Sequence, residues 1–566
     1  MPRTTASFAA AIAALLLVSG CGDDEVVQVQ PDQAIQVVVQ TAPESLDTGG
    51  RTSIQVIVQR APTGADLRYG WLADAGTFAD ATTDSTTWTA PDNPGVYGLS
   101  VVVTDGDNVA IAQKNVAVAT YMPADSPFYK GATSCSVCHN GGSGGTQWST
   151  WSVSAHASAI ESLQEIGMDS NPSCLKCHTV GSYGLNADAA LDNGGYDETA
   201  VPRLAGVQCE NCHGPGSQHP SPNFTSVDVT MDASLCGQCH TDAHHPTYDE
   251  WQTSAHAAGA TWTSSSPPGL RASCSKCHNG MVSAAYLDDP QNFVPPTVNP
   301  TQLVRHTCAV CHDAHGNDNP GSLRDASVTD VWLPNNVLVE EAGAGRLCIS
   351  CHNGRRTETD VLGQINNGSS NFGPHHSIQG DALKGVNAYQ TLAPGFPWSS
   401  SKHILVEDAC VACHTHEHAG DPEAGIPNFM GHDFLPTTEA CVRCHGPLTD
   451  FEDIFAKADF DGNGSIEGVQ VEIRGLLGLL QQTIIDKSRN DSVRMDFINN
   501  FIPTLGDTTK STRVQREAGY NWAYVDYDGS SGVHNTTYSV QLLQQSILYL
   551  EPSALPQAAF VLREDM

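Results

Sequence analysis

A short motif of two cysteines and a histidine recurs nine times along the 566 residues and uses every cysteine except Cys21. The copies are Cys135/Cys138/His139, Cys174/Cys177/His178, Cys209/Cys212/His213, Cys236/Cys239/His240, Cys274/Cys277/His278, Cys308/Cys311/His312, Cys348/Cys351/His352, Cys410/Cys413/His414 and Cys441/Cys444/His445. Cys-x-x-Cys-His is the attachment site for c-type haem: the thiols form thioethers with the porphyrin, and the histidine is the proximal iron ligand. A zinc site or a thioredoxin-like dithiol does not require that histidine. We therefore predict nine covalent haems.

Nine of the 23 histidines are proximal, which leaves 14 as candidates for the second axial position of each iron. We expect distal ligands among His156, His219, His245, His256, His315, His376, His403, His432 and His534. The other five are His244, His306, His375, His416 and His418. Two histidines close both axial positions and suit the iron to electron transfer. The sequence therefore favours an electron carrier over an enzyme, and we assign no catalytic residue.

The first six motifs form two triplets, with first cysteines at 135, 174 and 209 and at 236, 274 and 308. A Trp-x-x-Ser-Ala-His-Ala element beginning at Trp151 follows the first motif of one triplet, and a second copy beginning at Trp251 follows the first motif of the other. The last three motifs keep a looser version around Trp398 and His403. This internal repeat predicts three three-haem modules within residues 130–450.

The spacing of the motifs limits what the chain builds around the haems. Nine motifs lie between residues 135 and 445, which is too little chain for a separate apolar pocket around each porphyrin. We expect a mostly irregular and helical region that is organised by a stack of haems, with little regular sheet.

The N-terminus has the features of an export signal. Residues 1–20 combine Arg3 with a short apolar stretch, and Val18-Ser19-Gly20-Cys21 resembles the bacterial lipobox. The resemblance implies acylation of Cys21, which anchors a protein to a membrane surface without spanning it. Residues 21–30 are expected to form a polar tether. We expect a location at the outer membrane, the cell surface or the periplasm.

Residues 31–120 alternate apolar and polar side chains in the period of a strand, and turn signals separate the runs. The runs are Ile35 to Val39, Ser53 to Val58 and Val96 to Val103. They predict an all-β sandwich, which resembles bacterial Ig-like domains of the PKD type and has Trp71 and Trp88 in its core. Residues 451–566 have helical periodicity instead, in Val469 to Gln482 and Thr537 to Leu550.

An acidic loop in the C-terminal segment is a candidate for Ca²⁺. Asp459, Asp461, Asn463, Ser465 and Glu467 place oxygen atoms at alternate positions, as in an EF-hand loop. The twelfth position is Gln470, where a glutamate is usual, and Glu472 follows two residues later. A solvated acidic turn is the alternative interpretation.

The haem region resembles the multihaem cytochromes that include cytochrome c nitrite reductases and hydroxylamine oxidoreductases, and the doubled-motif cytochromes. The resemblance rests on the segment 206–216 with His219 behind it, on the Trp-x-x-Ser-x-His elements, on the segment 308–316 that ends after His315, and on the segment 532–535. It implies haem attachment, haem packing and electron transfer. The nitrite reductases have an active-site Cys-x-x-Cys-Lys haem motif, which is absent here, so reductase activity does not follow.

The net charge of −35, with 62 acidic and 27 basic residues, argues against nucleic acid as a partner. The expected function is electron transfer from a redox donor to another cytochrome, a mineral or a similar acceptor. A polymer in which a spare histidine ligates a neighbouring subunit's iron is a further alternative. A terminal reductase of a nitrogen or sulfur oxyanion, and an adhesion protein led by the sandwich, are the other two functions that the sequence leaves open.

Overall fold

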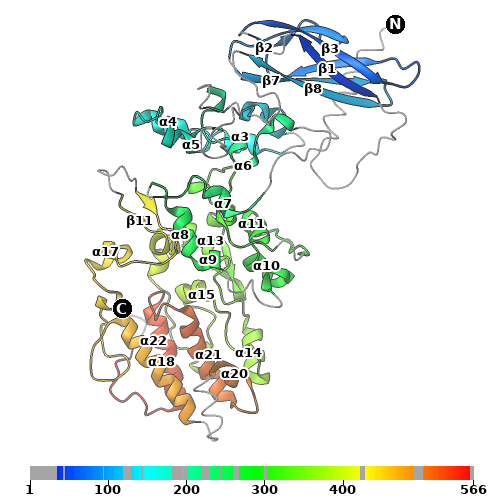
Figure 1. The fold of residues 1–566 in the computed structure, drawn as a ribbon. Coiled ribbons are helices and arrows are strands. Elements are labelled where there is room, and N and C mark those ends of the chain that lie inside the picture. The colour runs from blue at the N-terminus through cyan, green and yellow to red at the C-terminus, as the bar shows by residue number, and fades with distance from the viewer. Residues whose placement is uncertain are drawn as a thin grey trace. The chain divides into compact units, whose positions relative to one another are not determined.

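The computed structural model describes residues 35–42, 45–46, 48–93, 95–118, 129–141, 145–181, 195–196, 202–219, 230–242, 244–258, 267–298, 303–420, 428–487 and 501–560. The predicted signal peptide, Cys21 and the tether lie outside these residues. The chain forms two compact units, one of Met1–Cys239 with Ala314–Asp318 and one of His240–Asp313 with Asn319–Met566 (Figure 1). No helix among the described residues is long and apolar enough to cross a membrane.

The first unit begins with two four-stranded sheets, as the alternating sequence predicts. Their strands are β1 (Gln36–Ala42), β2 (Ser45–Leu46), β3 (Arg51–Arg60), β4 (Arg68–Ala73), β5 (Thr77–Phe78), β6 (Ser85–Thr89), β7 (Gly95–Thr104) and β8 (Val109–Val118). The strand orders are β1-β3-β6-β5 and β2-β8-β7-β4. All the pairings are antiparallel except that of β2 with β8.

The core of this β region comes from the inward side of each strand. On β3 the residues alternate between exposed and buried up to Val56, because successive side chains of a strand point to opposite faces. Trp71 and Trp88 are both buried in this core, which confirms their predicted role. The indole nitrogen of Trp71 donates to the carbonyl of Thr83 at 2.8 Å, and that of Trp88 donates to the carbonyl of Ala75 at 3.0 Å.

Short helices and irregular segments follow the sheets. In the first unit the helices are α2 (Ser136–His139), α3 (Gln147–Trp151), α4 (Ala159–Glu165), α5 (Pro172–His178), α6 (Cys209–His213) and α7 (Ala233–Cys236). The second unit begins with α8 (Thr247–Thr253), α9 (Ala255–Ala258), α10 (Ala272–His278), α11 (Gly280–Asp288), α12 (Cys308–Cys311), α13 (Arg346–Ile349), α14 (Glu358–Asn367), α15 (Gln379–Lys384), α16 (Cys410–His414) and α17 (Glu439–His445). Its strands form two small antiparallel pairs, β9 (Val331–Leu333) with β10 (Val337–Val339) and β11 (Glu417–His418) with β12 (Phe429–Met430).

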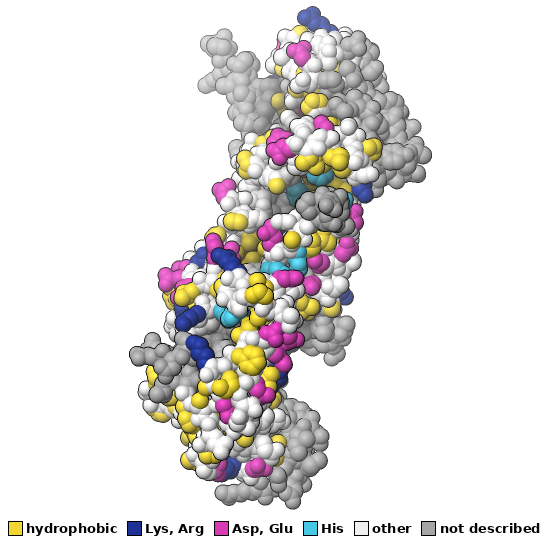
Figure 2. All heavy atoms as spheres, turned by 90° about the vertical axis from the view of Figure 1, so that its left-hand side faces the viewer, with side chains coloured by type: hydrophobic (Ala, Val, Ile, Leu, Met, Phe, Trp, Pro, Cys, Tyr) yellow, Lys and Arg dark blue, Asp and Glu magenta, His cyan; other side chains and the backbone are white. Residues whose placement is uncertain are grey.

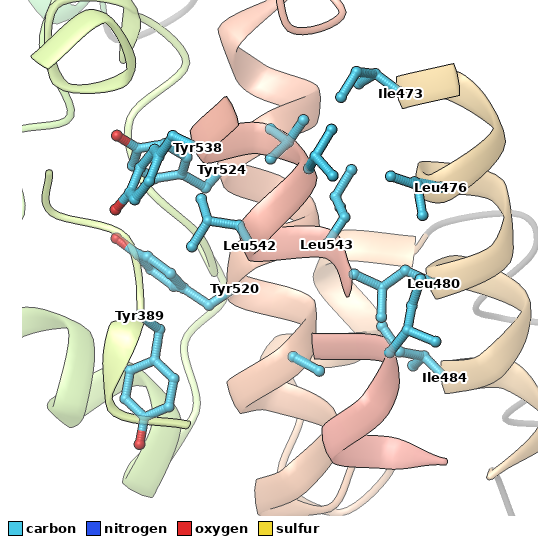
Figure 3. Packing of buried hydrophobic residues seen from close by; sticks show 14 of the residues in the cluster. Tyr389, Ile473, Leu476, Leu480, Ile484, Tyr520, Tyr524, Tyr538, Leu542 and Leu543 are labelled. Atoms are coloured by element: carbon cyan, nitrogen blue, oxygen red, sulfur yellow. The ribbon is translucent and has the colours of Figure 1, made fainter. Parts of the chain in front are cut away.

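The C-terminal part has longer helices, α18 (Val469–Asp486), α20 (Phe501–Gly506), α21 (Arg513–Asp528) and α22 (Thr536–Leu550). On α18 the buried Ile473, Leu476, Leu480 and Ile484 recur every three or four residues, and Figure 3 shows them on the side of α22 that carries Leu543. This spacing places one apolar stripe on the helix. The two helices expected from the sequence are therefore confirmed: α18 begins where predicted and continues to Asp486, and α22 begins one residue early and ends where predicted.

The C-terminal helices share their core with residues from before position 450. Val361 and Ile365 of α14 and Tyr389 belong to the same buried cluster as α18, α21 and α22. Asn521 of α21 accepts a hydrogen bond from the Tyr389 amide at 2.9 Å and donates to the Tyr389 carbonyl at 3.0 Å. The sequence placed a boundary at 450/451, but no break in packing occurs there.

The internal repeat seen in the sequence has matching contacts in the two units. The indole nitrogen of Trp151 donates to the carbonyl of Val207 at 2.9 Å, and that of Trp251 donates to the carbonyl of His306 at 2.9 Å. Each acceptor lies two residues before the third motif of its triplet. The tryptophan of each repeat therefore fixes the segment that leads into that motif.

We expect each tryptophan to stabilise only its own repeat. Trp251→Phe removes one hydrogen bond worth about 1 kcal/mol, so amide exchange at 306–312 should quicken by roughly fivefold. The exchange at 207–213 should not change, and Trp151→Phe should give the reverse pattern. Hydrogen–deuterium exchange with mass spectrometry measures both segments in the same sample. Equal effects of either variant on both segments would contradict the repeat.

Candidate haem-binding centre

Each Cys-x-x-Cys-His motif lies on, or at the end of, a short helical turn. In three motifs the histidine amide donates to the carbonyl of the first cysteine, at 3.0 Å for His139, 3.0 Å for His312 and 2.9 Å for His352. Residues three apart share one face of a helix, so the turn directs both thiols of a motif to the same side. The histidine follows within the same turn. This is the local arrangement that attachment of one porphyrin by two thioethers requires.

The eighteen cysteines of the motifs form no disulfide in the structure. Burial raises the pKa of Cys212 to about 11 and that of Cys311 to about 12. Thiolates are therefore disfavoured at these two positions, whereas a thioether carries no charge. Zinc needs thiolates, so these two positions suit a thioether better than a zinc site.

Cys138 and Cys444 differ in exposure from the other cysteines of the motifs. Both side chains are exposed, whereas Cys277 is buried and the other motif cysteines are half-buried. Cys138 belongs to the first motif along the chain and Cys444 to the last. Each of these two motifs therefore has a neighbouring motif in the sequence on one side only. The attachment of haem at these two positions stays a prediction. An outer haem would keep one thioether at the surface.

Thiols of different motifs lie close to one another within each unit. In four pairs the thiols lie close enough for one to raise the pKa of the other: Cys209 acts on Cys135, Cys177 on Cys239, Cys277 on Cys351, and Cys348 on Cys410. Further pairs affect each other's pKa electrostatically, among them Cys212 with Cys236, Cys311 with Cys348, and Cys413 with Cys441. The attachment points of neighbouring motifs are therefore adjacent, as the dense spacing in the sequence predicts.

Seven proximal histidines have the ring of a second histidine at a similar distance. The ring centres are 6.1 Å apart for His213 and His315, 6.0 Å for His240 and His245, 5.9 Å for His278 and His375, and 6.2 Å for His312 and His432, His352 and His256, His414 and His534, and His445 and His403. Two imidazoles on opposite sides of one metal ion hold their ring centres about 6 Å apart, because each metal–nitrogen bond is roughly 2 Å and the nitrogen lies roughly 1 Å from its ring centre. The residues present therefore fit axial pairs of haem iron.

Hydrogen bonds orient several of these rings. The Nδ1 atom contacts a backbone carbonyl in His178 (Ala159, 2.7 Å), His312 (Gly321, 2.7 Å), His414 (Phe434, 2.8 Å), His403 (Val533, 2.8 Å) and His432 (Met430, 2.7 Å). A ring that donates from Nδ1 keeps the lone pair of Nε2 for a metal. The backbone thus sets both the tautomer and the direction of the ligand.

Burial also keeps several rings neutral, which is the form that binds iron. It lowers the pKa of His256 to about 4 and that of His278 to about 4. The pKa of His375 falls to about 3, first through burial and then through the guanidinium of Arg355.

His534 differs from the other paired rings because its Nδ1 contacts a carboxylate. Asp528, at the end of α21, lies with Oδ1 2.7 Å from Nδ1 of His534, and the Asp528 side chain is 3% exposed. The other oxygen of Asp528 accepts from the Ser530 hydroxyl. Burial lowers the pKa of His534, but Asp528 more than offsets it, so the pKa is raised.

The structure brings most of the predicted distal ligands to a proximal histidine, and three need separate mention. The pKa of His219 is lowered, first by burial and then by the nearby His139. His156 is half-buried, and burial lowers its pKa. The ring centre of His376 lies 4.2 Å from that of Tyr527, while its neighbour His375 is the ring beside His278. Because His375 and His376 are adjacent, the sequence alone does not indicate which of them faces His278.

The candidate calcium loop has a different third carboxylate from the expected one. Carboxylate oxygens of Asp459, Asp461 and Glu472 lie within 4.8 Å of one another. Glu472 is buried and accepts from the amide of Phe460 at 2.8 Å, whereas Gln470 donates to the carbonyl of Ser530 at 3.0 Å. The residue at the usual twelfth position therefore points elsewhere, and the start of α18 places Glu472 in the loop.

Similarity to known proteins agrees with this centre. Residues 134–214 match the family model described as cytochrome c554 and c-prime. The polyhaem cytochrome OmcB of Geobacter sulfurreducens is 29% identical over 200 residues, which is 32% of this chain and 25% of OmcB. Cytochrome c-554 of Nitrosomonas europaea is 35% identical over 116 residues, 19% of this chain and 47% of that protein.

The matched parts are thus less than half of each relative's length. Among solved structures, an undecahaem cytochrome from the S-layer of Carboxydothermus ferrireducens has 17% identity and a TM-score of 0.46, covering 77% of this chain and 70% of that chain. The recurring motif, the facing imidazoles and the sequence similarities together identify the chain as a multihaem c-type cytochrome.

Proposed function

We propose that the protein is an exported, lipid-anchored cytochrome with nine haems that conducts electrons from a redox donor to an acceptor outside the cytoplasm. The observation that carries the proposal is the second imidazole beside seven of the proximal histidines. Bound haem supplies iron that alternates between Fe²⁺ and Fe³⁺, and two imidazole ligands leave it no open position for a substrate. This arrangement supports conduction over reduction of an oxyanion at an open iron.

The thiol contacts indicate which haems are neighbours in the second unit. The motif of Cys348 and Cys351 contacts the motifs of Cys277, Cys311 and Cys410. The motif of Cys413 in turn contacts that of Cys441. The relay therefore branches at the seventh motif, and one branch continues through the eighth to the ninth.

Export, anchoring and the acceptor are further parts of the proposal. The lipobox-like sequence at Cys21 supports lipidation, and the N-terminal β-sheets serve as a spacer between the membrane and the haems. Acidic side chains lie beside surface histidines on the face drawn in Figure 2. With 62 acidic against 27 basic residues, the surface favours a cationic or metal-bearing partner, such as a cytochrome or an oxide mineral.

Haem content and spin state of the purified protein test the function. We expect nine haem additions in the intact mass and in a pyridine haemochrome assay, and only low-spin iron in the electron paramagnetic resonance spectrum. Cyanide or nitrite should leave the signals of the seven haems with facing imidazoles unchanged, because both axial positions of those haems are occupied. A high-spin signal that nitrite abolishes would contradict the conduit and support the reductase.

For the seven haems whose ligand pairs the ring distances indicate, we propose the distal histidines named above, with His375 for the fifth motif. His534 is then the distal ligand of the eighth haem, opposite His414. A carboxylate on the far nitrogen of a ligating histidine makes that ligand more basic. A more basic ligand favours Fe³⁺, so Asp528 holds the reduction potential of this haem down.

Asp528→Asn tests this assignment. We expect the potential of one haem to rise by roughly 40 mV, which is about 1 kcal/mol for one electron, because the carboxylate charge beside the ligand is lost. Spectroelectrochemical titration followed by paramagnetic resonance measures the shift. Asp526→Asn, an exposed position on the same helix, is the matched control and should change no potential. A titration in which Asp528→Asn shifts no haem, or shifts all of them equally, would remove Asp528 from this role.

We also propose that Asp459, Asp461 and Glu472 bind one Ca²⁺, together with Asn463, Ser465 and Glu467 of the loop. The proximity of the three carboxylates supports this, since like charges close together gain from a divalent cation. The pKa of Asp461 is raised, first by burial and then by Glu472 and Asp459. The ion would tie the loop to α18.

Calorimetric titration of the chelator-treated protein with Ca²⁺ checks the loop. Glu472→Gln should weaken binding by about tenfold or more, equivalent to about 1.4 kcal/mol, because one charged ligand is lost. Glu161→Gln, an exposed acid on α4, should bind as the unchanged protein does. If Glu472→Gln binds Ca²⁺ with undiminished affinity, the loop is a solvated acidic turn.

A further inference from the structure

Two histidines that no haem pair uses lie together with a glutamate between the eighth and ninth motifs. His416 precedes β11, His418 lies on it, and Glu439 begins α17. The ring centres of His416 and His418 are 4.3 Å apart, and Nε2 of His416 lies 3.9 Å from Oε2 of Glu439. One ligand atom from each of the three residues lies within 4.8 Å of the other two.

The spacing of these two rings differs from that of the axial pairs. Ring centres 4.3 Å apart are too close to lie on opposite sides of a porphyrin plane, where about 6 Å is needed. The two rings do suit neighbouring ligands of one small tetrahedral ion, whose ligand atoms lie roughly 3.3 Å apart. Small side-chain rotations bring the three groups to that distance.

The residues around the cluster hold its side chains in place. The hydroxyl of Thr437 contacts Nε2 of His416 at 3.1 Å and Oε2 of Glu439 at 3.0 Å. The ring of His418 stacks on Phe429 of β12, with centres 5.1 Å apart. A Cβ added at Gly431 would lie 2.9 Å from Nε2 of His418, so glycine leaves the space that this nitrogen occupies.

The cluster is buried at His416 and open to solvent at Glu439. The side chain of His416 is 11% exposed, whereas that of Glu439 is 75% exposed. The histidines thus form a partly buried base, and the glutamate closes the site from the solvent side. The exposed glutamate leaves the cluster accessible to an ion from solvent.

We propose that His416, His418 and Glu439 bind one divalent transition-metal ion of the zinc type. Two imidazole nitrogens and one carboxylate oxygen are a common ligand set for zinc, whereas Ca²⁺ and Mg²⁺ prefer oxygen ligands alone. His416 lies two residues after His414, and Glu439 lies two residues before Cys441. The ion therefore links the hairpin of β11 and β12 to α17 and fixes the eighth and ninth haem-attachment motifs relative to each other.

Zinc titration of the full-length haem-loaded protein tests the site. After treatment with a chelator, we expect one Zn²⁺ per chain by calorimetry, and one zinc in addition to the haem iron by elemental analysis. His418→Gln and Glu439→Gln should each lower the affinity at least tenfold. Glu407→Gln, which changes an exposed glutamate outside the cluster, should bind as the unchanged protein does.

Two further measurements separate loss of the zinc site from loss of haem or of the fold. The iron content and the low-spin spectrum should be the same in every variant, because neither histidine ligates haem. Gly431→Ala, which keeps all three ligands but crowds His418, should also weaken Zn²⁺ binding. Loss of a low-spin signal in His418→Gln, no zinc bound to the unchanged protein, or equal zinc binding by all variants would each overturn the proposal.

Discussion

The distance between facing imidazoles is the constraint on which the haem region depends. Most proximal histidines have a second ring at the separation that one metal ion between them requires, and several rings are fixed by backbone carbonyls at Nδ1. Burial also holds rings such as His256 neutral. The chain thus organises short helices and irregular segments around metal–ligand geometry, in place of the extended apolar faces that organise most domains.

The second unit combines this metal-centred organisation with an ordinary hydrophobic core. α18, α21 and α22 pack through apolar stripes and share buried residues with α14 and with Tyr389. Asp528 ends α21, and His534 lies in the turn between α21 and α22, two residues before α22 begins. The turn between these helices depends on Gly529, which ends α21 with a φ of 74° that other residues rarely adopt. A rigid helix positions a carboxylate more exactly than a loop does.

Two clusters of polar ligands lie outside the paired imidazoles, and both connect local segments. The acidic loop before α18 joins that helix to the preceding chain through Glu472. The cluster of His416, His418 and Glu439 joins a two-stranded hairpin to α17. In a region with little regular sheet, such cross-links supply order that backbone hydrogen bonds alone do not.

The sequence by itself determined what depends on neighbouring residues. A helical turn brings the two cysteines and the histidine of each motif together, alternation marks the strands of the sheets, and spacing of three or four marks α18 and α22. Tertiary structure alone decided which distant groups meet: His414 with His534, His213 with His315, and His375 instead of His376 with His278. It also decided that Glu472, and not Gln470, turns into the acidic loop, and that Cys138 and Cys444 stay exposed while the other motif cysteines are covered to some degree. The physical reason is that axial ligand pairs, carboxylate clusters and the burial of a thiol all involve segments far apart in the chain. Which of these segments come into contact depends on how whole helices pack.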